Sequence, residues 1–194
     1  MPAPARQARL TPEEYLAIDS AAEIRSEFYD GVMYAMSGAS LPHNRLNQNL
    51  ARALGNQLEG GPCEVFTNDL RVGVREGAYV YPDLVVICGE PQLRAGKFTT
   101  LLNPSVIIEV LSPSNQDWDR GGKFLEYQQI ATLHHYILVH QVAPAVELYS
   151  RQPDGMWIRT DITWPDGVLA FASMGVAIPM RDIYARVFPP AQTA

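Results

Sequence analysis

The feature that most constrains the fold is a short apolar run, Val106 to Leu111, with a single carboxylate, Glu109, inside it. Continuous β-branched runs of this length are typical of strands that are covered on both faces. An ionised glutamate in such a strand is strongly destabilising unless it is paired. We therefore expect a cation, a set of hydrogen-bond donors or a metal ion beside Glu109.

A second stretch, Tyr81 to Cys88, has the same build, because a carboxylate, Asp83, stands at the start of an apolar run. Laid side by side, the two strands would bring Asp83 and Glu109 to one divalent ion, and carboxylate oxygens are the ligands that Mg²⁺ prefers. Two alternatives are open. Asp83 caps the turn at the strand start, or Glu109 forms an ion pair with an arginine such as Arg71 or Arg120.

The composition of the chain limits its partners. The 194 residues are 47% hydrophobic and 19% charged, as in an ordinary globular protein with one sizeable core. We expect one domain over residues 11–188, a flexible arm over residues 1–10 and a tail over residues 189–194. The net charge of −6 has the wrong sign for a broad basic face that grips nucleic acid. A phosphate-bearing partner would therefore be met locally or through a metal.

The two cysteines and the lack of long apolar runs predict where the protein works. Cys63 and Cys88 give no disulfide framework and no paired metal-ligand spacing, so we expect packed thiols in a reducing cytoplasm. No apolar run approaches the roughly 20 residues that span a bilayer, and the N-terminus lacks the apolar core of a signal peptide. The sequence predicts a soluble, cytoplasmic protein with no membrane partner.

Helical and extended patterns alternate along the chain. A capping box at residues 11–14 opens a helix to about Ile18, and Asp30-Gly31 between two alternating runs predicts a hairpin over residues 26–36. Leucines at helical spacing predict a helix over residues 42–58. Further strands are expected at residues 63–68, 70–75 and 80–88, as a meander, and at 106–111, 135–140, 145–150 and 156–163. A loop is expected over residues 89–103, a helix over 119–130, short strands within 167–178 and a closing helix over 181–187.

Three residues at four-residue intervals, Asp119, Lys123 and Tyr127, share one face of the helix expected after the Glu109 strand. If that face turns toward the sheet, Lys123 is the basic group that reaches the carboxylates. Tyr127 would then pack and hold Lys123 or Glu109 by a hydrogen bond. The alternative is a solvated Lys123 that merely pairs with Asp119 at the surface.

Glu27 and two histidine sites carry weaker signals. Glu27 lies on the first hairpin strand, where glutamates are more often exposed than catalytic. His43 is in the first turn of the second helix, where it caps or lies at the surface, or else contacts a phosphate or shuttles a proton. His134 and His135 are adjacent, so on a strand they point to opposite faces and cannot both ligate one ion.

Taken in order, these residues resemble a known family. The Glu27 hairpin with Asp30-Gly31, His43, Pro82-Asp83, the stretch Glu109-Val-Leu-Ser-Pro-Ser and the spaced Asp119, Lys123 and Tyr127 are similar to the Uma-type restriction-endonuclease-like proteins of the PD-(D/E)XK nuclease superfamily. The resemblance covers roughly residues 12 to 188. It implies an α/β (α+β) fold, in which helices flank a mixed central sheet and an N-terminal β-hairpin is added. It also implies DNA as the substrate and Mg²⁺, with Mn²⁺ as the alternative ion, at Asp83 and Glu109.

The same resemblance implies the roles of the site residues. The catalytic set is Asp83, Glu109 and Lys123, and the supporting set is Glu27, His43, Asp119 and Tyr127. In the superfamily pattern a lysine lies two residues after the acidic strand residue, and here that position is Leu111. Migration of the lysine onto the next helix is a known variation, which points to Lys123.

Two functional hypotheses follow. The first is a Mg²⁺-dependent endonuclease that hydrolyses DNA phosphodiester bonds. A homodimer fits this hypothesis and the second one alike, because two sites cut both strands of a duplex most easily. The second is a catalytically inactive nuclease-fold module for binding or assembly, motivated by the acidic net charge and by Leu111.

Overall fold

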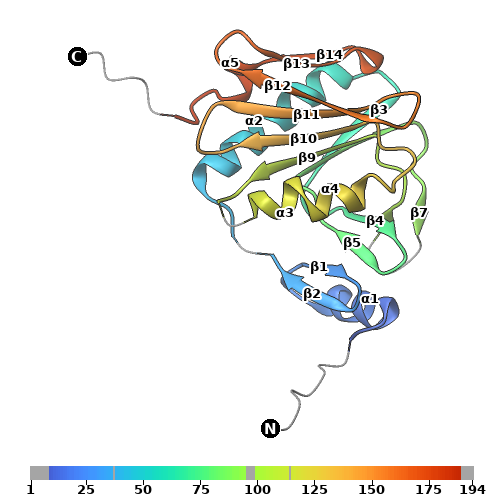
Figure 1. Cartoon of the computed structure of the whole chain (residues 1–194). Coiled ribbons are helices and arrows are strands. Elements are labelled where there is room, and N and C mark those ends of the chain that lie inside the picture. Colours follow the sequence, from blue (N-terminus) through green and yellow to red (C-terminus); the bar gives the residue numbers. More distant parts are fainter. Residues whose placement is uncertain (1–8, 37, 95–98, 114, 189–194) are drawn as a thin grey trace.

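The part of the chain that the structure describes forms two six-stranded sheets and one two-stranded sheet, with helices against them (Figure 1). The computed structural model describes residues 9–36, 38–94, 99–113 and 115–188. The strand order of the larger layer, here called the central sheet, is β12-β11-β10-β9-β6-β3. In it β9 and β10 are parallel and the other neighbouring pairs are antiparallel. The predicted mixed central sheet with flanking helices is confirmed.

The central sheet is buried in its middle and has cores on both faces. Its strands are β3 (Cys63–Thr67), β6 (Leu84–Cys88), β9 (Val106–Leu111), β10 (His135–His140), β11 (Ala145–Arg151) and β12 (Trp157–Thr163). Every residue of β9 is buried. Ile108 and Val110 pack into one core, whereas Ile107 and Leu111 pack into the other. This two-sided burial is why the β9 sequence is a continuous apolar run rather than an alternating one.

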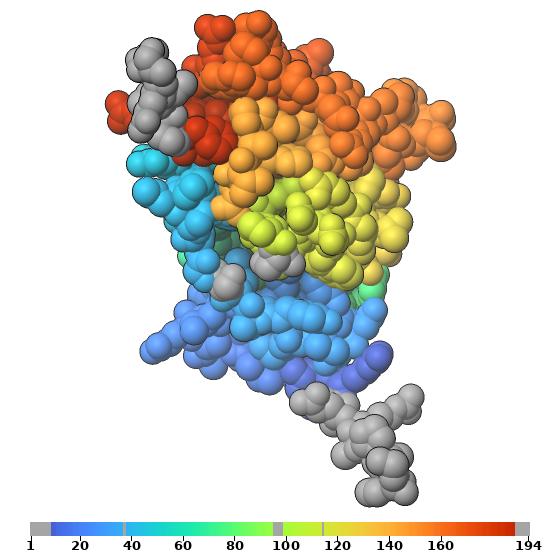
Figure 2. Space-filling model, turned by 60° about the vertical axis from the view of Figure 1, so that its left-hand side comes forward, coloured from blue at the N-terminus to red at the C-terminus, as the bar shows by residue number. Residues whose placement is uncertain are grey.

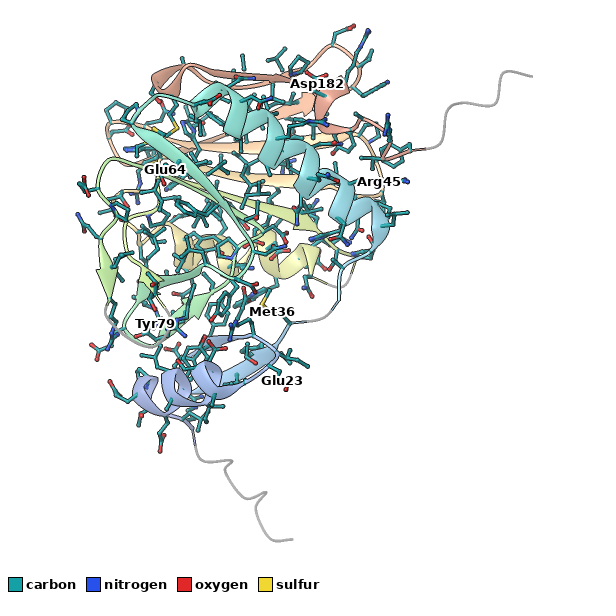
Figure 3. All side chains as sticks on the ribbon, turned by 180° about the vertical axis from the view of Figure 1, so that it is seen from behind. Glu23, Met36, Arg45, Glu64, Tyr79 and Asp182 are labelled. Atoms are coloured by element: carbon teal, nitrogen blue, oxygen red, sulfur yellow. A yellow bond between two sulfur atoms is a disulfide. The ribbon has the colours of Figure 1, made fainter. Side chains whose placement is uncertain are left out.

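The helix α2 (Leu41–Leu58) covers one face of the central sheet, as Figure 3 shows. Its leucines Leu46, Leu50 and Leu54 are fully buried against the sheet, which confirms the helix predicted from their spacing. The same core is closed by β13 (Val168–Phe171), a 3-10 turn (Ala172–Met174), β14 (Val176–Pro179) and α5 (Met180–Ile183). Among the helices of the described residues, none is both long and apolar enough to cross a membrane.

The second six-stranded sheet, here called the N-terminal sheet, packs against the face of the central sheet that is opposite to α2. Its order is β2-β1-β5-β4-β8-β7. The strands are β1 (Ser26–Tyr29), β2 (Val32–Ala35), β4 (Arg71–Arg75), β5 (Ala78–Val80), β7 (Leu93–Arg94) and β8 (Thr100–Leu101). Valines of β4 and β5 share a core with β6 and β9, so this sheet and two short helices, α3 (Gln116–Arg120) and α4 (Gly122–Tyr127), cover the second face.

The predicted meander over residues 63–88 is wrong. β3 pairs with β6 in the central sheet, whereas β4 and β5, which lie between them in the chain, belong to the N-terminal sheet. The single strand expected at residues 80–88 is divided into β5 and β6 around Pro82, which has no backbone N–H to donate. The stretch predicted as a loop, residues 89–103, contains the two short strands β7 and β8.

The capping box and the hairpin turn predicted near the N-terminus are confirmed. Thr11 and Glu14 form the reciprocal capping box that opens α1 (Pro12–Ala21). Asp30 and Gly31 have φ angles of 44° and 90°, as a type I′ hairpin turn between β1 and β2 requires. The Leu10 N–H donates to the Gly31 carbonyl (3.0 Å), so the chain is bound to the hairpin from there. The rest of the expected arm, residues 1–8, and the tail, residues 189–194, lie outside the described residues.

The helix predicted over residues 119–130 is shorter and broken. Gly121 ends α3 and precedes α4, in keeping with the low helix propensity of glycine. α4 ends at Tyr127 rather than near Ile130. The break leaves the common face intact, because Asp119 on α3 and Lys123 on α4 remain in contact.

Cys63 and Cys88 are joined by a disulfide, which corrects the expectation of two thiols. They stand directly opposite each other on the antiparallel pair β3 and β6, with their Cα atoms 4.0 Å apart. The separation of 25 residues did not indicate this pairing. The two cysteines face each other only because β3 pairs with β6, while β4 and β5 between them belong to the N-terminal sheet. The two cysteines therefore do not support a reducing compartment.

Candidate active site

The strands β6 and β9 bring the two expected metal ligands together. Asp83 directly precedes β6, whose antiparallel register with β9 pairs Leu84 with Ile108. Asp83 therefore lies near Glu109, the residue after Ile108, and its charge adds to the rise in the pKa of Glu109. Glu109 shares its face of β9 with Ile107 and Leu111, which pack in the core that α4 and the N-terminal sheet cover.

Asp83 is held by groups from β9 and α2. The Val110 N–H donates to Asp83 Oδ2 (2.8 Å). On the other oxygen, His43 Nε2 lies 2.9 Å and Asn47 Nδ2 3.3 Å from Asp83 Oδ1. His43 reaches the site from the first turn of α2, where its Nε2 contacts the Asp83 side chain directly before β6. Contacts to other elements thus take the place of the local turn cap considered for Asp83.

Glu109 is buried and bonded on one oxygen. Its Oε1 accepts a hydrogen bond from the Tyr127 hydroxyl (2.8 Å) and lies 2.8 Å from Lys123 Nζ. Burial raises the pKa of Glu109 to about 8; Lys123 opposes this rise, whereas the charges of Asp119 and Asp83 add to it. A nearby positive charge therefore stabilises the ionised form of Glu109.

The arginines considered as partners of Glu109 are paired elsewhere. Arg71 Nη1 lies 2.8 Å from Asp19 Oδ2, and Arg120 Nη2 lies 2.8 Å from Glu147 Oε1. The cation beside Glu109 is Lys123, from the helix face predicted to turn toward the sheet.

Lys123 is surrounded by carboxylates. Its Nζ lies 2.8 Å from Glu109, 3.0 Å from Glu27 and 3.8 Å from Asp119. The lysine is only 5% exposed, so the alternative of a solvated side chain is wrong. Burial alone would lower the pKa of Lys123, but Glu109 and Glu27 outweigh it and hold this pKa well above its ordinary value.

The N-terminal hairpin supplies one wall of the site. Alternation along β1 sends Phe28 toward Tyr15 under α1, and Glu27 and Tyr29 toward α4. In Figure 2 the blue hairpin segment lies beneath the yellow-green segment that carries α3 and α4. The buried Tyr29 hydroxyl has no hydrogen-bond partner among the described residues. Burial raises the pKa of Tyr29, so it stays a neutral donor beside the charged groups.

The charges of the site do not balance. The carboxylates of Glu27, Glu109 and Asp119 share a single lysine, Lys123, and the nearby charge of Asp83 adds to theirs. The amide oxygen of Asn47, buried next to Asp83, also lacks a partner within the described residues. Excess negative charge and free oxygen atoms are what a hard divalent cation needs.

The donor set fits Mg²⁺ better than a metal bound by many side chains. In the described ranges, no three or more His, Cys, Asp or Glu side chains are arranged to hold one ion. Two carboxylates with solvent and substrate oxygens in the remaining positions are a common arrangement for Mg²⁺. Asp83 and Glu109 are the residues placed to provide those two.

The sequence did not reveal every residue of this site. Asn47 lies one helical turn after His43, and Tyr29 lies two residues after Glu27 on the same strand face; these spacings were the available signals. His135 lies outside the site, with its ring 5.1 Å from that of Phe171, and burial lowers its pKa to about 4.

The comparison with known families now bears on this geometry. The family model of Uma2, described as "Putative restriction endonuclease", matches residues 12–179. The chain belongs to the Uma2 family. The resemblance drawn from the hairpin, the two carboxylate strands and the spaced helix residues is thereby confirmed.

Two relatives and a solved structure are also similar to this chain. Two uncharacterized proteins of Synechocystis are similar over nearly their whole lengths. One is 34% identical over 177 residues, 91% of this chain and 92% of the relative. The other is 36% identical over 168 residues, 86% and 95%. A crystal structure of a "putative nuclease belonging to DUF820" from Anabaena variabilis has a TM-score of 0.76 over 92% of this chain and 99% of that one. At 17% identity this likeness concerns the fold.

Proposed function

We propose that the protein is a Mg²⁺-dependent endonuclease that hydrolyses DNA phosphodiester bonds. The observation that carries the proposal is that Asp83, directly before β6, lies close enough to Glu109 on β9 for their charges to interact, with Lys123 against Glu109. Membership of the Uma2 family supports the nuclease class. The metal and the DNA substrate rest on the chemistry of this site.

Asp83 and Glu109 would hold the ion, Mg²⁺ or alternatively Mn²⁺. When bound, such an ion lowers the pKa of a water molecule and offsets the charge on the phosphate. Asp83 is oriented for this task by the Val110 N–H, which occupies one of its oxygens, and by His43 on the other. His43 is also the group placed to accept or return a proton beside Asp83.

Lys123 would neutralise the scissile phosphate or orient the attacking water. Glu27 and Asp119 hold its ammonium group beside Glu109, and the raised pKa keeps it charged at neutral pH. It would do the work of the strand lysine whose position is taken by Leu111, which is 4% exposed and packs in the core. Tyr127 positions Glu109 by its hydrogen bond.

The second candidate is a nuclease fold that binds without cutting. The observation that favours it is the Lys123–Glu109 ion pair, because this pair neutralises the Glu109 charge without any metal. The net charge of −6 points the same way. Such a module would bind its partner equally well with and without Mg²⁺.

A plasmid-nicking assay separates the two functions. We expect the protein to nick supercoiled plasmid with Mg²⁺ and not with a chelator, and we expect Asp83→Ala and Glu109→Gln to lose nicking. Asp166→Asn is the matched control, because that side chain is 85% exposed and pairs with Arg181 away from the site. Equal nicking by the parent protein and Asp83→Ala would refute the nuclease assignment. Metal-independent DNA binding without nicking would establish the binding module.

The homodimer and the cytoplasmic location stay predictions. We propose the dimer as the active form on duplex DNA, where each copy would cut one strand. Light scattering of the purified protein checks it, and a monomer with full activity on both strands would contradict it.

A further inference from the structure

Two exposed aromatic side chains lie beside the carboxylate site. Tyr34 on β2 is 53% exposed and Trp118 on α3 is 46% exposed. The hairpin register pairs Tyr34 with Glu27, so the two side chains share the face on which Glu27 meets Lys123. Trp118 directly precedes Asp119, another partner of Lys123. Both rings therefore flank the groups that hold the lysine.

Both rings are held in place by the same buried residue. Tyr29 contacts the Tyr34 ring at 6.0 Å and the Trp118 ring at 5.4 Å between centroids, in edge-on geometry. The indole also lies directly over Gly122, where a Cβ atom would come within 1.9 Å of it. Only glycine leaves room for the indole there. Trp118 is thus fixed on one side while about half of its surface remains open.

The charge of the site sets what such rings can bind. Three carboxylates around one lysine, with Asp83 nearby in a chain of net charge −6, attract a DNA backbone poorly in the absence of metal. Stacking of a base on an aromatic ring adds affinity that needs no positive charge and little sequence preference. In a duplex the base faces are already stacked on each other, so only unpaired bases can use these rings.

We propose that Tyr34 and Trp118 form a stacking platform for unpaired bases, and that the substrate class of the site is therefore single-stranded or locally opened DNA. This inference rests on the proposed nuclease function and names the form of its substrate. A base on the platform brings the adjoining phosphodiester to the carboxylates that share this face. Duplex DNA reaches the site where its strands are opened.

The test is a binding measurement on the intact protein. Fluorescence anisotropy compares a labelled single-stranded oligodeoxynucleotide with the same strand annealed to its complement, with Ca²⁺ in place of Mg²⁺ to limit cleavage. We expect Trp118→Ala and Tyr34→Ala each to weaken single-strand binding about 10-fold, to change duplex binding little, and Trp118→Phe to retain most of the affinity. Trp164→Ala is the matched control, because Trp164 is 48% exposed and follows β12 at the far edge of the central sheet.

Each outcome decides between the platform and the nuclease. Unchanged single-strand affinity in both alanine variants overturns the platform, and so does an equal loss for single strand and duplex. If the parent protein binds neither DNA, both proposals fall. If the aromatic variants lose single-strand binding while Asp83→Ala nicks plasmid as fast as the parent, the platform stands and the nuclease site is wrong. Thermal unfolding checks that each variant is folded, and Tyr34 provides a second readout should Trp118→Ala fail to fold.

Discussion

Two clusters of buried charge lie on opposite faces of the N-terminal sheet, and they are built differently. In the cluster under α1, Asp19 and Arg71 form an ion pair at 2.8 Å, with side chains 0% and 3% exposed. Neutral groups add to this pair: the Ser26 N–H and the Tyr81 hydroxyl donate to Asp19, and Arg71 donates to the Thr100 hydroxyl. In the candidate active site, three carboxylates share Lys123 and Asp83 adds a fourth negative charge nearby, and buried atoms of Tyr29 and Asn47 lack partners among the described residues.

The difference separates a structural ion pair from a ligand site. A neutral pair with its hydrogen bonds made has nothing to gain from a further ion, but it is costly to break because the remaining charge stays buried. A cluster with surplus negative charge responds in the opposite way, because adding a cation or removing a carboxylate reduces the repulsion between its charges. The two clusters should therefore respond in opposite ways to substitution and to metal.

The largest expected effect is on the structural pair. Arg71→Met leaves Asp19 buried without a cation, and the free energy of unfolding should fall by about 3–5 kcal/mol. Urea denaturation measures it. Arg75→Met is the matched control: its pairs with Asp30 and Glu126 are partly exposed, so its loss should be about 0–1 kcal/mol. Equal losses in the two variants would show that the buried pair has no special role in stability.

These clusters also show how far the sequence could be used. A carboxylate inside the β9 run had to be neutralised, and the four-residue spacing of Asp119, Lys123 and Tyr127 identified the cation correctly. The partner of Arg71 was not predictable, because Asp19 is far away in the chain and only the packing of α1 on the N-terminal sheet brings it there. Asn47 and Tyr29 were missed for the same reason.

In the fold, too, locally specified elements were predictable from the sequence and long-range pairings were not. Elements specified by local chemistry, such as the capping box of α1, the Asp30-Gly31 turn and the leucine stripe of α2, matched their predictions. β4 and β5 belong to the N-terminal sheet because of pairing between strands that are distant in the chain. The periodicity of hydrophobic residues does not encode such pairing. The disulfide of Cys63 with Cys88 depends on this pairing and was missed with it.

The second prediction concerns Asp83. Asp83→Asn keeps the shape of the side chain but removes one ligand charge, so the cleavage rate should fall by about 100-fold or more. Its stability should be unchanged or slightly higher, because one of four mutually repelling carboxylates is gone. Single-turnover cleavage and urea denaturation measure the two quantities. A variant that loses stability as Arg71→Met does would place Asp83 with the structural pair instead.

The third prediction is the response to metal. Mg²⁺ at ten times its dissociation constant should raise the free energy of unfolding by about 1.4 kcal/mol through binding to the folded state alone. Thermal unfolding with and without the ion measures this gain. Arg71→Met should keep the gain, whereas Glu109→Gln should lose it. The same gain in both variants would mean that Mg²⁺ binds at another place on the protein.

The fourth prediction is a pH slope in the metal-free protein. Because burial raises the pKa of Glu109 from 4.5 to about 8, the folded protein keeps a proton between these values that the unfolded chain has lost. The free energy of unfolding should therefore fall as the pH rises from 4.5 to 8, by less than about 1.4 kcal/mol per pH unit. Glu109→Gln should flatten this slope.

Glu147 is the matched control, because hydrogen bonds from Arg120 and His140 outweigh burial there and lower the pKa of that carboxyl. The stability from Glu147 is lost only as the pH falls below the unfolded value, so Glu147→Gln should leave the slope above pH 5 unchanged. Parallel slopes in the parent protein and Glu109→Gln would show that Lys123 already balances the site, and the contrast with the Asp19–Arg71 pair would disappear.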